Sequence, residues 1–309
     1  MKIRIIELVE KYFDITFVDF VPKQFADCEI SLTKLSKNEE LLFSIETFNE
    51  ICANTLSKSG PRRKEQWELG WQSSGIFLDE NISRLPIPLY FTKNNIIRLK
   101  GELYNIDNKY AEIYILRVLQ NFYLNAAKKE FVGINCIAEY GCGTGHNLDF
   151  LNQIGFGKEN LYGYDWAESA IDRIKKCSFL EKSNFDTIDY FDKLSFKSPN
   201  KEFIAFTFAS LEQTGVNFKN FMNYLFDNEN CVGGLHIEPI WELLPNTSTP
   251  RLISRLYCQN RNYLTGFFDF MKLNEEFKNI KILNYNLNGF GSKFIEGYIP
   301  IIWKKNGKI

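Results

Sequence analysis

The sequence comprises 309 residues, of which 45% are hydrophobic, 24% charged and 16% aromatic. This length provides ample core for one large domain or two modest ones, and the composition is that of an ordinary globular protein. The formal net charge of −1 argues against a general phosphate-backbone binder, which needs a basic face, so we expect no nucleic-acid partner.

Cysteine usage and hydropathy bound the cellular setting. The seven cysteines form no C-x-x-C pair, and an odd count without metal spacing predicts reduced thiols in a cytoplasm. The N-terminal segment has charges inside its apolar stretch, unlike a signal peptide, and the sequence has no run of about 18 apolar residues that would predict a membrane span. We therefore expect a cytoplasmic protein with no membrane partner.

Residues 1–104 are expected to form a mostly helical N-terminal cap or lid. Apolar residues at roughly helical spacing predict helices over 5–13 and 40–56, and Ser59-Gly60-Pro61 then breaks the pattern. Residues 82–104, with two prolines, indicate an extended connection.

The segment 62–71 carries two Trp and three basic residues in ten positions. One interpretation is a helix that packs Trp67 and Trp71 on the core. The other is a lid whose Trp and Arg side chains face a ligand pocket.

The second predicted domain covers residues 105–309. A strongly periodic helix over 107–130 precedes an alternation of strands and helices, which is the pattern of a doubly wound α/β sheet. After the first strand, further strands are expected at 161–165, 185–192, 203–208, 231–238, 281–286 and 296–304, with later helices at 217–228 and 250–277.

The first strand of this domain leads into a glycine-rich loop. Ile137-Ala138 precedes Glu139, and Gly141, Gly143 and Gly145 follow at alternate positions. A buried strand, a tight turn and a helix start are the arrangement by which open α/β sheets bind nucleotide-like ligands. The glycines permit positive φ and a close approach of the backbone to a ligand.

The spacing of the loop argues against a dinucleotide. A G-x-G-x-x-G fingerprint would place its third glycine where His146 stands. An acid beside the loop also suits a cationic ligand better than a pyrophosphate. The stretch resembles motif I, E/D-x-G-x-G-x-G, of the class I S-adenosylmethionine-dependent methyltransferases, whose loop wraps the amino-acid end of a cofactor with a positive sulfonium.

Asp165 ends the second strand of the domain, 24 residues after Gly141. An acid about 20 residues beyond a glycine loop is placed to accept hydrogen bonds from ribose hydroxyls. The resemblance implies the same role. It covers about residues 107–309 and implies a Rossmann-like methyltransferase sheet that ends in an antiparallel hairpin.

The resemblance also implies a set of cofactor contacts. Asp189 and Asp192 compete for the third-strand role of contacting the adenine amino group. Ser210-Leu-Glu-Gln213 is similar to the family's loop beneath the cofactor, where His often follows the Leu-Glu pair. The candidate residues for S-adenosyl-L-methionine are Glu139, Tyr140, Gly141, Gly143, Gly145, His146, Asp165, Trp166, Asp189, Ser210 and Leu211.

Two residues near the end of the fifth strand are candidates for catalysis. His236 is the candidate general base because imidazole titrates near neutral pH, and Glu238 alternates onto the same face. Glu238 would orient the imidazole, bind an acceptor hydroxyl or join a metal site, but a single His-Glu pair is too small a set to predict a metal. The alternative for His236 is a core histidine on a buried strand.

The candidate acceptor contacts come from the cap and from two later segments. Arg261 to Tyr263 are expected to lie within the helix over 250–277, in a region where this family often builds acceptor contacts, with a solvated helical face as the alternative. The full set is Trp67, Trp71, Glu212, Arg261, Asn262 and Tyr263.

The predicted function is therefore methyl transfer to a hydroxyl of a sugar, nucleotide-sugar or similar small metabolite. The His236-Ile-Glu-Pro block and the Arg261-Asn-Tyr segment are similar to sugar-modifying bacterial methyltransferases. The alternatives are N-methylation of a small amine or protein side chain, and a non-catalytic binding module; a nicotinamide dehydrogenase is disfavoured by the glycine spacing. The oligomeric state stays open, with a homodimer as one option.

Overall fold

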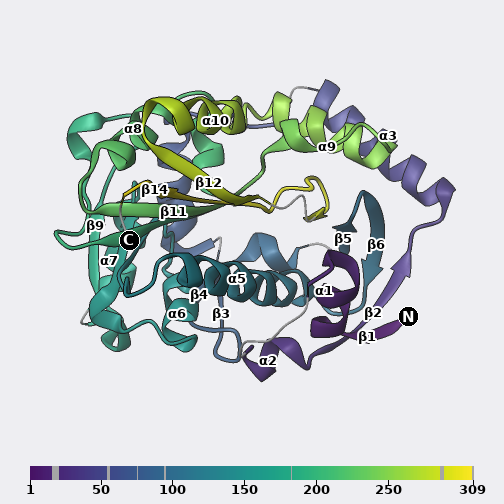
Figure 1. The fold of residues 1–309 in the computed structure, drawn as a ribbon. Coiled ribbons are helices and arrows are strands. Elements are labelled where there is room, and N and C mark those ends of the chain that lie inside the picture. Colours follow the sequence, from purple (N-terminus) through teal and green to yellow (C-terminus); the bar gives the residue numbers. More distant parts are fainter. Residues whose placement is uncertain are drawn as a thin grey trace.

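The computed structural model describes residues 1–15, 21–53, 56–74, 76–93, 95–181, 183–285 and 289–307. Within these residues the chain forms a seven-stranded sheet, a five-stranded antiparallel sheet and a two-stranded ribbon, with helices around them (Figure 1). No helix in this described part is both long and apolar enough to cross a membrane.

The seven-stranded sheet is the centre of the C-terminal half. Its strand order is β12-β14-β11-β10-β7-β8-β9, and β14 is antiparallel to both of its neighbours while the other pairs are parallel. The central strand β10 is buried along its whole length, as a continuous apolar run predicts. The strands are β7 (Ile137–Tyr140), β8 (Leu161–Asp165), β9 (Asn184–Thr187), β10 (Phe203–Phe208), β11 (Cys231–Glu238), β12 (Ile280–Tyr285) and β14 (Ile299–Lys305).

Helices cover both faces of this sheet, because successive side chains of a strand point to opposite faces. Ile204 and Phe206 pack into the core shared with α5, α6 and α7, whereas Phe203 and Ala205 pack with α8 and α10 (Figure 1). The predicted doubly wound sheet with its terminal antiparallel hairpin is confirmed. The helices are α5 (Ala111–Glu130), α6 (His146–Gln153), α7 (Glu168–Lys175), α8 (Lys219–Asp227), α9 (Thr249–Asn260) and α10 (Phe267–Phe277).

The long helix predicted over 250–277 is two helices. Helix α9 ends at Asn260, and both Asn262 (φ 53°) and Gly266 (φ 76°) adopt left-handed conformations that a helix cannot contain. The Glu242 carboxylate accepts a hydrogen bond from the Gly266 amide at 2.8 Å and thereby fixes the start of α10. Arg261 to Tyr263 thus lie in the turn between the helices and not within one.

The bounds of three predicted strands of the C-terminal domain also differ from the structure. The third strand, β9, is short and ends at Thr187, so residues 188–192 form a loop. The sixth strand ends at Tyr285, and Asn286 lies outside the described residues. The last strand begins at Ile299, three residues later than predicted.

The N-terminal region contains six strands as well as helices, so the expectation of a mostly helical cap was incomplete. The segment 82–104, predicted as a connection, supplies β4, β5 and β6. Lys100 (φ 51°) and Gly101 (φ 84°) form the tight turn that joins β5 to β6, a conformation typical of two-residue hairpins. The strands are β1 (Lys2–Arg4), β2 (Glu29–Lys34), β3 (Ile76–Asp79), β4 (Ser83–Pro88), β5 (Ile96–Leu99) and β6 (Glu102–Ile106).

The helices of this region include the two that the periodicity predicts. α1 is confirmed over its predicted span, and α3 begins earlier than expected because Ser36 and Glu39 form a capping box. The end predicted for α3 includes residues 54 and 55, which lie outside the described residues. The helices are α1 (Ile5–Phe13), α2 (Lys23–Ala26), α3 (Lys37–Cys52) and α4 (Lys64–Leu69).

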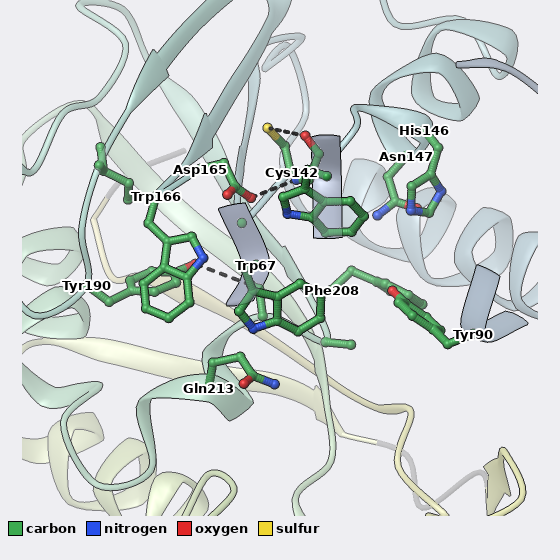
Figure 2. A pocket seen from close by; sticks show the side chains of 16 residues that line it. Trp67, Tyr90, Cys142, His146, Asn147, Asp165, Trp166, Tyr190, Phe208 and Gln213 are labelled. Atoms are coloured by element: carbon green, nitrogen blue, oxygen red, sulfur yellow. Dashed lines mark hydrogen bonds between the residues drawn. The ribbon is translucent and has the colours of Figure 1, made fainter. Parts of the chain in front are cut away.

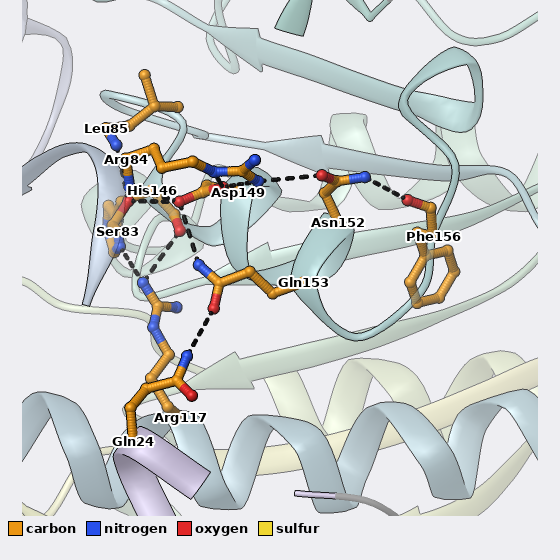
Figure 3. A network of polar contacts seen from close by, with 10 residues as sticks. All are labelled: Gln24, Ser83, Arg84, Leu85, Arg117, His146, Asp149, Asn152, Gln153 and Phe156. Atoms are coloured by element: carbon orange, nitrogen blue, oxygen red, sulfur yellow. Dashed lines mark hydrogen bonds and ion pairs between the residues drawn. The ribbon is translucent and has the colours of Figure 1, made fainter. Parts of the chain in front are cut away.

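The N-terminal region is joined to the central sheet at several points. The short strand β13 (Phe290–Gly291) pairs with β5 and completes the five-stranded sheet. Figure 3 shows a second junction: the buried Asp149 of α6 accepts hydrogen bonds from the Arg84 amide at 2.6 Å and from Ser83 Oγ at 3.1 Å. Thr144 of the glycine loop also donates to the Pro86 carbonyl. Strand β4 therefore fixes the position of the loop and of the helix after it.

Candidate functional site

The glycine loop follows β7 and needs glycine at each of its three positions. Gly141, Gly143 and Gly145 have φ of 79°, 53° and 79°. A Cβ on Gly141 would lie 2.3 Å from Ser210 Cβ, so even alanine would displace the neighbouring loop. The amides of Gly141 and Cys142 both donate to the Tyr164 carbonyl of β8, at 2.7 and 2.9 Å. The loop is thus held open at the carboxyl edge of the sheet.

Asp165 shapes the same loop from the end of β8. Its carboxylate accepts hydrogen bonds from the Gly143 amide at 2.8 Å and from the Ala167 amide at 2.9 Å. Burial raises its pKa to about 6, against the lowering effect of these amides. Since each carboxylate oxygen has two lone pairs, both oxygens keep acceptor capacity toward a ligand.

Glu139 lies behind the loop and is fully buried. Its Oε1 accepts from Asn147 Nδ2 at 2.7 Å, while its Oε2 has no hydrogen-bond partner among the described residues. Burial raises its pKa to about 8. Asn147 in turn accepts from the buried Arg117 at 2.7 Å, and the same guanidinium lies 2.7 Å from His146 Nδ1 (Figure 3). Arg117 and Asn147, which motif spacing did not reveal, therefore connect the acid and the histidine of the motif.

A cavity opens in front of this loop, as Figure 2 shows. It holds about 670 Å³ of space not filled by protein atoms, part of it open to solvent. The structure brings six of the predicted cofactor residues together in its wall: Gly141, Gly143, His146, Asp165, Trp166 and Ser210. The remaining wall residues are Trp67, Trp71, Tyr90, Cys142, Asn147, Ile188, Tyr190, Phe208, Ala209 and Gln213.

Five predicted cofactor residues are not in that wall: Glu139, Tyr140, Gly145, Asp189 and Leu211. Asp189 instead accepts from Lys64 Nζ at 3.3 Å and from the Phe191 amide at 2.9 Å. Its rival Asp192 caps the Leu194 amide at 3.0 Å. Because β9 ends early, it is Ile188 and Tyr190, on either side of Asp189, that face the cavity. Neither aspartate is placed by this geometry to contact a ligand there.

Two tryptophans of the N-terminal region form one side of the cavity. Trp67 of α4 stacks on Trp71 with ring centroids 5.4 Å apart, and Arg63 lies 5.2 Å from the Trp67 ring. The Trp71 ring would be 3.1 Å from a Cβ on Gly143, so it lies directly against the glycine loop. Of the two interpretations of this segment, the geometry fits the one in which both indoles face a pocket.

A second and larger cavity adjoins the first. It holds about 1610 Å³, again partly open, and shares Trp67, Trp71, Tyr90, Ala209 and Gln213 with the first cavity. The predicted acceptor residues Glu212, Arg261 and Tyr263 line it, but Asn262 does not, since its Nδ2 donates to the Ser59 carbonyl at 3.3 Å. Arg63, which the lid interpretation of segment 62–71 included, lines it as well. The remaining wall residues, which the sequence did not single out as ligand contacts, are Gln66, Gly70, Leu89, Lys93, Glu112, Tyr257, Ser292, Phe294, Ile295 and Tyr298.

His236 does not reach either cavity, so the geometry does not support it as a general base. It is fully buried, its Nε2 accepts from Trp303 Nε1 at 2.9 Å, and its Nδ1 lies 2.9 Å from Thr207 Oγ1. An indole N–H only donates, so Nδ1 carries the proton and the ring is neutral. Burial lowers its pKa to about 3. The alternative of a core histidine describes what is observed.

Glu238 is likewise a structural residue in this geometry. Its carboxylate accepts from the backbone amides of Ser210, Leu211 and Glu212, each at 3.2 Å. It therefore caps the turn that carries Glu212 and Gln213 to the junction of the two cavities. The sequence correctly placed Glu238 at a strand end, but alternation along a strand could not show that amides would occupy it.

Glu212 lines the second cavity next to Gln213, a residue that both cavities share. Its Oε1 accepts from Gln213 Nε2 at 2.8 Å, and its Oε2 accepts no hydrogen bond from the described residues. Burial, followed by the nearby Glu238 carboxylate, raises its pKa to about 8. Such a group is suited to take up a proton near neutral pH.

Comparisons with known proteins give structural similarities. No protein-family model matches the sequence, and a search of curated proteins gives no match. A plantazolicin methyltransferase, BpumL, in complex with a pentazolic desmethylPZN analog and SAH is similar at 16% identity and a TM-score of 0.43 over 62% of this chain and 85% of that chain. A SAM-dependent methyltransferase from Anabaena variabilis is similar at 12% identity and a TM-score of 0.44, over 81% of this chain and 98% of that chain. The magnesium protoporphyrin IX methyltransferase of Synechocystis with bound SAM is similar at 12% identity and a TM-score of 0.43 over 63% and 83%.

The central sheet defines the class of fold. Its strand order, with the antiparallel β14 between β11 and β12, gives the doubly wound sheet with a terminal antiparallel hairpin that the resemblance of the glycine-loop motif implies.

Proposed function

We propose that this chain is an S-adenosylmethionine-dependent methyltransferase that acts on a hydroxyl of a sugar, nucleotide-sugar or similar small metabolite. One observation carries the proposal. The cavity at the glycine loop joins, through five shared residues, a larger cavity whose wall includes Glu212, a carboxylate with one oxygen that has no hydrogen-bond partner among the described residues. Such an arrangement brings a cofactor and an acceptor to a common boundary.

The first cavity suits the proposed cofactor. Gly141 and Gly143 form a cradle that a Cβ would fill, and Asp165 keeps acceptor capacity at its edge. Trp166 and Tyr190 offer aromatic surface at the end away from His146 (Figure 2). These residues would hold S-adenosylmethionine, with Asp165 toward the ribose. When bound, the cofactor supplies an electrophilic methyl group on a positively charged sulfur.

Glu212 is the proposed general base in place of His236. With an acceptor hydroxyl in the second cavity, the Glu212 carboxylate would take up the proton that the hydroxyl loses as its oxygen is methylated. The Glu238 cap fixes the backbone of this turn, so Glu212 is held in place while the acceptor reacts. Holding two reactants in a productive orientation can lower the barrier of such a displacement by on the order of 7–11 kcal/mol.

Calorimetric titration of the purified chain with S-adenosylhomocysteine tests the cofactor. We expect micromolar binding, and no binding of NAD under the same conditions. A methyl-transfer screen over sugars and sugar nucleotides then tests the acceptor class. Binding of NAD without binding of S-adenosylhomocysteine would overturn the proposal.

A further inference from the structure

The second cavity is lined by two guanidinium groups, those of Arg63 and Arg261, which lie far apart in the sequence. Arg63 lies just before α4 and Arg261 just after α9, and both line the cavity. The two segments are fastened to each other, because the Ser59 amide donates to the Arg261 carbonyl at 2.7 Å. The proximity of the two charges is therefore built into the fold.

Neither guanidinium meets a counter-charge within ion-pair distance in the described part of the chain. Arg63 is 9% exposed and donates only to the neutral Gln66 and Gln213 side chains, at 3.1 and 3.2 Å. The Nε of Arg261 is buried and has no hydrogen-bond partner among the described residues. By contrast, Arg251 on α9 pairs with Glu296 at 2.8 Å. A buried charge without a partner is costly unless a ligand or water completes it.

The two groups also oppose each other. Burial first, and then the charge of Arg261, lower the pKa of Arg63. Glu112 and Glu212 line the same wall, but their carboxylates accept hydrogen bonds from Tyr298 and Gln213, and no ion pair joins them to either guanidinium in the described part of the chain. Lys93 adds a third cation to this wall.

Aromatic rings set the orientation of the two guanidinium groups. Arg63 lies 5.2 Å from the Trp67 ring, and Arg261 lies 5.3 Å from the Tyr263 ring and 5.9 Å from the Tyr257 ring. A guanidinium presents its N–H groups in a planar fork, which matches the two oxygens of a carboxylate or phosphate, and neighbouring rings restrict the positions that the side chain can take.

We propose that Arg63 and Arg261 bind an anionic group, a carboxylate or a phosphate, of the methyl acceptor. This inference rests on the proposed function and narrows its acceptor class from sugars, nucleotide-sugars and similar metabolites to acidic or phosphorylated hydroxyl compounds. Gln213 supports the placement, because its Oε1 accepts from Arg63 while its Nε2 donates to Glu212. The anion and the reacting hydroxyl would thus lie on either side of one glutamine, within the span of a small molecule.

The test uses the full chain saturated with S-adenosylhomocysteine, titrated with inorganic phosphate, D-glucuronate, UDP-glucose and, as a neutral control, D-glucose. The variants are Arg63→Gln, Arg261→Gln and both together, with Arg62→Gln as the matched control, since Arg62 is exposed and lines neither cavity. We expect at least one anionic probe to bind, and each cavity variant to weaken it about tenfold or more, whereas Arg62→Gln leaves it unchanged. Glucuronate against phosphate separates a carboxylate from a phosphate ligand.

Folding and cofactor binding are followed in parallel. Arg63→Lys keeps the charge without the fork and should bind the anion with an intermediate affinity. Equal binding of the anionic probes to wild type and the double variant would overturn the inference, as would a loss of S-adenosylhomocysteine affinity in Arg63→Gln, which would assign the arginines to the cofactor. If wild type bound phosphate through these arginines but failed to bind S-adenosylhomocysteine, the proposed function would fail while the anion site stood.

Discussion

The first cavity is walled mainly by turns that follow the strands of one sheet, whereas the second is assembled from segments near both ends of the chain. Loops after β7, β8, β9 and β10 supply most of the first wall. The second wall draws on the turn before α4, the turn after α9 and the segment before β14. Local motifs can therefore specify the proposed cofactor side, but the proposed acceptor side exists only when the N-terminal region is folded onto the sheet.

The largest expected effect is on the first cavity, with Asp165→Ala. The change removes the acceptor for the Gly143 and Ala167 amides as well as the carboxylate that faces the ligand. We expect S-adenosylhomocysteine affinity to fall on the order of a thousandfold, about 4 kcal/mol. Asp186→Ala is the control, because Asp186 on β9 forms an exposed ion pair with Lys197. Calorimetry would count against the proposed cofactor site if the two variants bound equally well.

The next effect separates folding from chemistry, with His236→Ala. Loss of the buried ring leaves a cavity and an unpaired Trp303 Nε1, so we expect a loss of about 3 kcal/mol in the free energy of unfolding. Turnover per folded molecule should stay within a fewfold of wild type. A rate loss of a hundredfold without a loss of stability would restore His236 as a catalytic candidate.

The same residue gives a pH dependence with a defined sign. The pKa of His236 is about 3 in the folded chain and about 6.5 when unfolded. Between these values the unfolded state binds the extra proton, so stability contributed by this group is lost as pH falls from about 6.5 towards 3. Denaturant titrations should show this acid-sensitive component in wild type and a smaller slope in His236→Ala.

The third prediction concerns Glu212 in the wall of the second cavity and uses the change Glu212→Gln. The amide keeps the shape of the side chain but cannot take up a proton, so we expect kcat to fall about a hundredfold with S-adenosylhomocysteine affinity unchanged. Since burial raises the pKa of Glu212 to about 8, the wild-type rate should climb as pH rises through about 8, and the variant should lose that climb. An unchanged rate would favour an amine acceptor, because the lone pair of a neutral amine can attack without first losing a proton to Glu212.

Glu238 and Glu212 show how much of the site the sequence could predict. Both acids were singled out by their places after predicted strands, and both lie where the strand order puts them. Their roles depend on the hydrogen-bond donors around them. The Glu238 carboxylate accepts from three backbone amides of the turn after β10, whereas one oxygen of Glu212 has no partner among the described residues. The donors come from the loop after a neighbouring strand, so the spacing of residues along one strand cannot predict these roles.

The fold was predictable to a similar depth. Periodicity and glycine spacing predicted the sheet, the loop and Asp165, because these are set by short stretches of chain. The strands of the N-terminal region were missed, since β5 completes its pairing with β13 from a distant part of the sequence. Lys93 was missed as a ligand contact for the same reason, because only tertiary contacts bring it to the proposed acceptor cavity, whereas the lid interpretation of segment 62–71 already included Arg63.

The smallest expected effect tests the wall that the two cavities share, with Trp67→Ala. Trp67 is half-buried, and its Nε1 has no hydrogen-bond partner among the described residues, so its removal should cost little stability. Its stacking on Trp71 holds that ring against Gly143, and an aromatic pair contributes about 0.5–1.5 kcal/mol, so S-adenosylhomocysteine affinity should fall by up to about tenfold. Trp67→Phe retains a ring and should recover most of the affinity. If Trp67→Ala instead raised only the KM of the acceptor, the indole would belong to the second cavity alone, and the boundary between the two sites would lie at Trp71.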